Sequence, residues 1–287
     1  MKVMLLGLGK SGTTALLYKL AAGLPGCQAF SGGRPGKYNN AYVNAVYKHT
    51  YEERKGKDFD LYREHLKKEH YDRKIWIARD PRDVAVSRML YRWNRGCIGH
   101  RKQFRAHLDL VIKKEADPLA IPFYEICRYA GHDDWPVDVQ VIVDEETDRY
   151  QRMHDFVSSL DSEWFLFTYE DMISNNYSAL DEYLGFGVQA DMSVPDSTGK
   201  AKVVRKKACG DWRHWFTEED VKLFRLAYSA YMKLMGYDVD DWQSSAGPVI
   251  EPEFSSVYMQ NLVQRVPLDT ARRLKGQAQR LFARKAG

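Results

Sequence analysis

Short apolar runs alternate with amphipathic segments along this chain, and the first twenty residues set the pattern. Residues 3–6 form an apolar run, glycines punctuate the next stretch, and apolar residues then recur at helical spacing from Ala15 to Ala21. Gly23 is expected to end this helix as its C-cap. The start of the chain therefore predicts a buried strand, a glycine-rich turn and a helix.

Similar runs predict strands at residues 27–30, 44–49, 74–79 and 164–169. Helices are expected at four further places: 58–70, 83–93, 177–184, and a long helix with Thr217 as N-cap, Asp220 three residues later and Gly236 at its end. Strands that alternate with helices predict an α/β fold of three layers, in which a central parallel sheet is flanked by helices. In such a sheet, ligands bind at the carboxyl ends of the strands.

Composition and charge exclude several classes of protein. The 287 residues are 44% hydrophobic and 29% charged, which is ordinary for a globular protein. The net charge of +4, from 43 basic and 39 acidic side chains, is too small to predict a nucleic-acid partner. The four cysteines form no CxxC pair, so no metal site is expected. With no apolar run near ~20 residues and a first strand at the N-terminus, the chain reads as a cytoplasmic protein.

The turn between the first strand and helix has the features of an anion site. The first backbone N–H groups of a helix lack partners, and the helix dipole makes that end positive. Lys10 adds a mobile charge, and Ser11, Thr13 and Thr14 add hydroxyl groups. Gly9-Lys10-Ser11 imitates the end of an ATP-binding or GTP-binding P-loop, but that motif needs a glycine where this chain has Met4. The predicted ligand is a phosphate or a similar oxyanion.

A second anion site is indicated further along the chain. Arg79 stands at the end of a predicted strand, and Ser87 follows eight residues later on the next helix, so that both side chains can converge on one phosphate. A basic run, Arg205-Lys206-Lys207, precedes Gly210-Asp211-Trp212.

These segments resemble the sulfotransferases that use PAPS (3′-phosphoadenosine 5′-phosphosulfate). Lys10 to Thr14, KSGTT, resembles their 5′-phosphosulfate loop, and residues 79–87, 167–171 and 205–212 resemble further segments of the family in the same order. The resemblance implies a P-loop-like fold and a set of nucleotide-binding residues. That set is Lys10, Ser11, Gly12, Thr13 and Thr14 for the 5′-phosphate, Arg79, Ser87, Arg205 and Lys206 for the 3′-phosphate, and Tyr169 near the adenine.

Two positions depart from the family. Lys207 stands where the family has a glycine that lets the backbone approach the phosphate, and Ala15 stands where many members have a tryptophan that stacks on the adenine. The resemblance covers scattered blocks from residue 1 to about residue 234. It leaves residues 95–160 and those after 245 unmatched.

The resemblance implies in-line transfer of a sulfuryl group from PAPS to a hydroxyl or amine acceptor, with PAP as product. Lys10 would neutralise charge on the leaving phosphate oxygen. His49 is the predicted general base, and Glu52 or Glu53 is the alternative. The acceptor is left open as a small molecule, a carbohydrate or a lipid.

The predicted organisation is a sulfotransferase domain at 1–245, in which about 95–160 is a helical, acceptor-lining region, and a helical tail at 246–287. Residues 257–287 hold seven basic residues and one acid. This tail is read as a peripheral membrane or self-association helix, or else as a solvated terminal helix. Two other functions stay open. One is a P-loop kinase or NTPase with Asp80 as its magnesium ligand, and the other is a non-catalytic nucleotide-binding protein.

Overall fold

The computed structural model describes residues 1–31, 42–51, 70–94, 96–130, 135–195 and 206–264. The helix expected at 58–70 lies outside this part of the chain except for its last residue. Within the described residues, every helix is too short or too polar to cross a bilayer.

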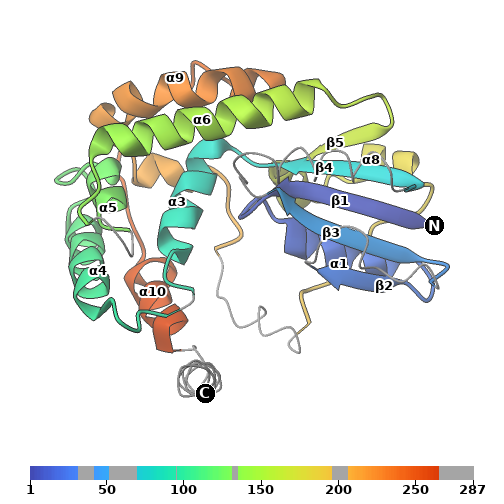
Figure 1. Ribbon diagram of the computed structural model, residues 1–287, viewed down its shortest axis with the longest axis horizontal. Coiled ribbons are helices and arrows are strands. Elements are labelled where there is room, and N and C mark those ends of the chain that lie inside the picture. Colours follow the sequence, from blue (N-terminus) through green and yellow to red (C-terminus); the bar gives the residue numbers. More distant parts are fainter. Residues whose placement is uncertain (32–41, 52–69, 95, 131–134, 196–205, 265–287) are drawn as a thin grey trace, which may run out of the picture.

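The described strands form one five-stranded sheet in which every neighbouring pair is parallel (Figure 1). β1 (Lys2–Leu8) lies at the centre, between β3 (Ala45–Tyr51) and β4 (Arg73–Ala78). β2 (Gln28–Ser31) and β5 (Trp164–Thr168) form the two edges. The predicted parallel sheet is confirmed, and the carboxyl ends of its strands share one edge.

Helices cover both faces of the sheet and complete the predicted three-layer α/β fold. α1 (Thr13–Gly23), α7 (Tyr169–Ile173) and α8 (Ser178–Leu184) pack with β1 and β4 on one face. The other face packs against α3 (Pro81–Tyr91), α6 (Val139–Ser158) and α9 (Glu218–Leu234). α6 and α9 run side by side over that second face (Figure 1). α4 (Arg101–Ala116) and α5 (Phe123–Arg128) extend the same layer, so the helical character expected for the middle of the chain is confirmed.

The buried carboxylate of Asp220 accepts hydrogen bonds at the starts of both α5 and α9. Asp220 and Thr217 form the predicted capping box of α9. The same carboxylate accepts hydrogen bonds from the backbone N–H groups of Phe123 and Tyr124, both at 2.8 Å, at the start of α5. Because a buried carboxylate is stable only when its oxygens are hydrogen-bonded, Asp220 locks α5 and α9 into one arrangement.

Gly23 differs from its predicted role. It is the last residue of α1, and Leu24 is the C-cap. A Cβ on Gly23 would lie 2.4 Å from the carbonyl oxygen of Gly187. The glycine is therefore needed for close contact between α1 and the segment after α8, rather than for a left-handed cap.

The chain beyond residue 245 continues the same core. The short helix η3 (Pro252–Phe254) and α10 (Ser256–Gln264) follow one another, and α10 contacts α3 and α4 (Figure 1). Ile250, Tyr258, Met259 and Leu262 belong to the hydrophobic cluster that also holds the buried faces of α3 and α9. The boundary predicted at 245 thus does not separate two cores. The seven basic residues counted in the tail lie at 265–287, outside the described residues, so the basic helix stays a prediction.

Candidate functional site

A cavity of about 320 Å³ opens at the carboxyl edge of the sheet. Its walls come from the turn after β1, the end of β3, α3, residues 206–211, and the η3–α10 segment. Most of the predicted site residues line it: Lys10, Gly12, Thr13, Thr14, Arg79, Ser87, Tyr169 and Lys206. The structure therefore brings together segments that lie almost 200 residues apart in the sequence.

The turn between β1 and α1 presents a helix N-terminus to this cavity. β1 ends at Leu8 and α1 begins at Thr13, and Gly12 takes a left-handed conformation with φ of 87° as the N-cap. Among the described residues, no side chain caps α1. The start of the helix therefore offers N–H groups that no side chain caps, as an anion site requires, and the hydroxyl-bearing Thr13 and Thr14 line the same wall.

Ser11 does not take part as predicted. Its side chain is 1% exposed, and its hydroxyl donates a 2.7 Å hydrogen bond to the carbonyl oxygen of Leu8. The backbone N–H of Ser11 donates to the same oxygen. Ser11 is also absent from the cavity wall. The Ser11 side chain therefore closes the turn after β1, and its hydroxyl is directed into the protein and not toward the cavity.

Two lysine side chains reach the cavity, one from the turn before α1 and one from β3. The ammonium of Lys10 lies 3.6 Å from the centroid of the Tyr91 ring. The ammonium of Lys48, in the middle of β3, donates a 3.0 Å hydrogen bond to the hydroxyl of Thr14. Lys48 is a site residue that the sequence analysis does not predict. The signal that could identify it is a basic residue inside an otherwise largely apolar strand that pairs with β1.

His49 is not brought to the cavity, contrary to the prediction. Successive side chains of a strand point to opposite faces of the sheet, and Lys48 and Thr50 take the positions that line the cavity. His49 is 2% exposed and lies on the face of Tyr47 and Tyr51, under the helical layer that holds α6. The alternative bases Glu52 and Glu53 lie outside the described residues.

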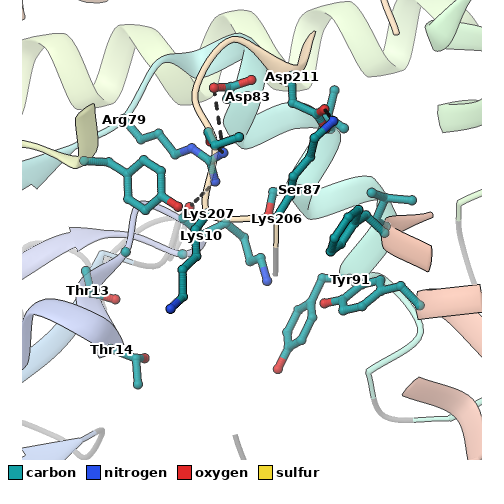
Figure 2. A pocket seen from close by; sticks show the side chains of 18 of the residues that line it. Lys10, Thr13, Thr14, Arg79, Asp83, Ser87, Tyr91, Lys206, Lys207 and Asp211 are labelled. Atoms are coloured by element: carbon teal, nitrogen blue, oxygen red, sulfur yellow. Dashed lines mark hydrogen bonds and ion pairs between the residues drawn. The ribbon is translucent and has the colours of Figure 1, made fainter. Parts of the chain in front are cut away.

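Arg79 joins three parts of the site (Figure 2). Its guanidinium donates to the carbonyl oxygens of Lys10 and Ala208, both at 3.3 Å, and lies 4.3 Å from the centroid of the Tyr169 ring. Its Nε is buried with no hydrogen-bond partner among the described residues. A Cβ on Gly12 would lie 2.6 Å from Cδ2 of Tyr169, so only glycine lets the turn approach this ring. The contacts fix Arg79 and Tyr169 against the start of α1.

Asp83 is a site residue that sequence reasoning missed. Its carboxylate accepts hydrogen bonds from the N–H groups of Gly210 at 2.8 Å and Trp212 at 3.0 Å, and it lies 3.7 Å from the guanidinium of Arg79. Burial raises its pKa to about 6, although nearby Arg79 opposes this shift. Asp83 therefore holds residues 208–212 against α3. Its side chain stands one turn before Ser87, which lines the cavity.

Two residues of the basic run, Lys206 and Lys207, have surroundings that differ from the prediction. The ammonium of Lys206 lies 3.1 Å from Asp211 and 3.4 Å from Glu251, so its charge is already paired with two carboxylates. Lys207, where the family has glycine, takes a left-handed conformation with φ of 49° and lines the cavity. A lysine therefore occupies a left-handed backbone position that glycine adopts more readily, and it adds a charged side chain to the wall (Figure 2). Arg205 lies outside the described residues.

Comparison with known proteins adds a distant likeness. No family model matches the chain, and no curated protein matches it. Several solved structures are similar in fold. Among them is mouse sulfotransferase SULT7A1 in complex with PAP, at 15% identity and a TM-score of 0.48, over 81% of this chain and 84% of that chain. So distant a likeness assigns no activity, which has to be inferred from the residues around the cavity.

Proposed function

We propose that this chain is a PAPS-dependent sulfotransferase, which moves a sulfuryl group from PAPS to a hydroxyl or amine acceptor. The observation that carries the proposal is that one cavity contains two separate groups of anion-binding residues. A nucleotide with phosphates at both its 5′ and its 3′ positions would need both groups, whereas ATP or GTP would need only one.

The first group would hold the 5′-phosphosulfate. It consists of the uncapped N-terminus of α1, the hydroxyls of Thr13 and Thr14, and the ammonium groups of Lys10 and Lys48. N–H groups at a helix start, aided by nearby cations, bind a tetrahedral oxyanion without help from other parts of the chain. In this proposal Lys48 replaces Ser11 among the residues expected from the sequence.

The second group would hold the 3′-phosphate. Arg79 and Ser87 line the cavity from just before α3 and from α3 itself, and Lys206 and Lys207 line it from the segment before Gly210. Arg79 is oriented by two carbonyl oxygens and by Asp83, so its position is fixed before a ligand arrives. Lys207 supplies a charge at the position where a family glycine would supply only backbone access.

Transfer would follow from this placement. The acceptor oxygen forms a new bond to sulfur while the bond from sulfur to the 5′-phosphate oxygen breaks, and PAP leaves with the electron pair of that bond. Lys10 and Lys48 neutralise the charge that develops on the leaving oxygen. The acceptor proton passes to a base, for which Glu52 and Glu53 stay the candidates since His49 lies on the other face of the sheet.

Two features count against the kinase or NTPase alternative. Met4, at the position of the required glycine, lies inside β1, so the strand occupies the space where a longer phosphate loop would begin. Asp80, the candidate magnesium ligand, accepts hydrogen bonds from the backbone N–H and the guanidinium of Arg82 and caps α3. It does not line the cavity.

Calorimetry with three ligands tests the proposal. PAP and AMP differ only in the 3′-phosphate, and charge-assisted hydrogen bonds to that group predict at least about tenfold tighter binding of PAP. ATP with Mg²⁺ is the third ligand. Binding of ATP–Mg²⁺ without binding of PAP would refute the proposal in favour of an NTPase. Tight PAP binding by a protein that transfers no labelled sulfuryl group to any acceptor would favour the non-catalytic alternative.

A further inference from the structure

We propose that the solvent-facing side of α4 is a docking surface for an anionic lipid bilayer. The basic stretch at residues 265–287 would bind the same bilayer as a second contact. The inference does not depend on the proposed function, because the described wall of the cavity contains no residue of α4.

The outer side of α4 carries unpaired positive charge. At about 3.6 residues per turn, its seven exposed residues share an arc of about a third of the helix circumference. Four of the seven are basic, and one, Asp109, is acidic. None of the four basic side chains forms an ion pair with a described residue, whereas Arg152 on α6 pairs with Asp148. The arc consists of Arg101, Lys102, Arg105, Asp109, Ile112, Lys113 and Ala116.

Apolar side chains are exposed among these charges. Ile112 lies within the basic arc and is 44% exposed. Ile98 and Leu119, in the turns before and after α4, are each 61% exposed. In a helix that lies in the interface of an anionic membrane, basic side chains contact the head groups while apolar side chains enter the acyl boundary. A nucleic acid would match the charges and leave the three apolar side chains in water, so the combination favours lipid.

The exposed side of α6 has the opposite charge. Four exposed acidic side chains lie along it: Asp144, Glu145, Asp148 and Asp155. Figure 1 shows α6 along the top of the molecule, and α4 with α10 below it on one side. An anionic bilayer attracts the α4 side and repels the α6 side. The distribution of charge therefore turns α4 toward the lipid.

The basic stretch begins on the same side of the molecule. α10 contacts α4, and the carboxylate of Glu115 on α4 accepts hydrogen bonds at the start of α10, from the backbone N–H of Ser256 at 2.8 Å and from its hydroxyl at 3.0 Å. α10 ends at Gln264, and the residues after it hold seven basic side chains and one acid. Weak membrane anchors need a second signal for stable binding. The α4 surface and the basic stretch are therefore expected to act together.

Co-sedimentation of the full chain with vesicles of phosphatidylcholine and phosphatidylserine tests the inference. Each basic side chain near an anionic surface contributes roughly fivefold to binding. Lys102→Glu/Arg105→Glu should therefore lower the partition coefficient at least about 25-fold. Ile112→Asp removes an apolar side chain and adds a negative charge, so it should lower the coefficient at least about fivefold. For the wild type, added salt should weaken the binding.

α9 provides matched controls, because it lies beside α6 in Figure 1. Lys222→Glu/Lys233→Glu makes the same change in net charge at two exposed positions. Leu226→Asp makes the same kind of change as Ile112→Asp, at a side chain that is 88% exposed. Each control should change the partition coefficient by less than about threefold, because charges more than about 10 Å from the lipid are largely screened. Since all these positions are exposed, every variant should unfold within about 3 °C of the wild-type Tm.

Several results would overturn the inference. Partitioning that stays unchanged in Lys102→Glu/Arg105→Glu, or that falls equally in the α9 charge control, would show that the α4 surface is not the contact. Failure of the wild type to bind the vesicles, or equally tight binding to phosphatidylcholine alone, would exclude an anionic bilayer as the partner. Binding to heparin without binding to the vesicles would instead favour a soluble polyanion.

Discussion

Gly12 is the residue with the least conformational freedom in the turn between β1 and α1. It combines a left-handed φ of 87° with the close approach to Tyr169. Replacement by alanine should both strain the backbone and displace the ring that contacts Arg79. We therefore expect Gly12→Ala to weaken PAP binding at least about tenfold, as measured by calorimetry, and to lower the Tm.

Gly26→Ala is the matched control for this change. Gly26 also has a positive φ, of 63°, but a Cβ there would meet no atom within 4 Å. It should cost about 1–2 kcal/mol of stability through backbone strain alone and leave PAP affinity unchanged. Equal PAP affinities in the two variants would mean that the contact between Gly12 and Tyr169 does not affect PAP binding.

Lys207 is expected to show opposite effects on stability and on binding. A lysine at φ of 49° is strained, so Lys207→Gly should raise the free energy of unfolding by about 1 kcal/mol. The same change removes a cation from the cavity wall and should weaken PAP binding. Lys207→Ala removes the charge but keeps the strain, so it should weaken binding without the gain in stability. Urea unfolding and calorimetry measure the two effects separately, and a Lys207→Gly variant that binds PAP as tightly as wild type would exclude a role for this charge.

Among elements, the contact between α3 and residues 208–212 depends on a buried acid, Asp83. The pKa of Asp83 is about 6 in the folded protein, above its ordinary value of 3.8, because burial disfavours the charged form. Between these two values the folded state holds a proton that the unfolded state has released. This group therefore adds stability as the pH falls through about 6, and the gain levels off near pH 4.

The expected result is a difference in pH dependence between wild type and Asp83→Asn. The margin of stability of wild type over the variant should be about 1 kcal/mol larger at pH 5 than at pH 7. Urea unfolding at both pH values measures this margin, and the comparison cancels groups that titrate alike in the two proteins. A margin that shrinks as the pH falls would show that the pKa of Asp83 is lowered in the folded state.

At the scale of secondary-structure elements, the sequence predicts local features but not the contacts between distant segments. The turn after β1 was predictable because its glycines and its strand–helix pattern are local. The face chosen by His49 was not, since a strand buried on both sides shows no alternation of apolar and polar residues. The roles of Asp83, Asp220 and Glu115 were also hidden. Each carboxylate binds backbone N–H groups about a hundred or more residues away, and a backbone donor has no sequence signature.

At the scale of the whole molecule, the residues after 245 belong to the fold. Ile250, Tyr258, Met259 and Leu262 are each at most 8% exposed and pack into the cluster beneath α3. Burial of such side chains contributes roughly 1.5–3 kcal/mol each, and a domain has only about 5–15 kcal/mol of net stability. A chain that ends at residue 245 should therefore unfold at much lower urea concentration than the full chain, or fail to fold.

A chain that ends at residue 264 is the matched truncation, because it keeps those four side chains and removes only the basic stretch that follows. We expect it to unfold cooperatively at a urea concentration close to that of the full chain and to bind PAP with the same affinity. Comparison of the full chain with the 1–264 chain also tests the prediction of a membrane-binding tail. The full chain should co-sediment with vesicles rich in anionic lipid, and the 1–264 chain should not. Equal sedimentation of both would exclude the tail as the membrane contact. Similar stability of the 1–245 and 1–264 chains would instead show that α10 is not part of the core.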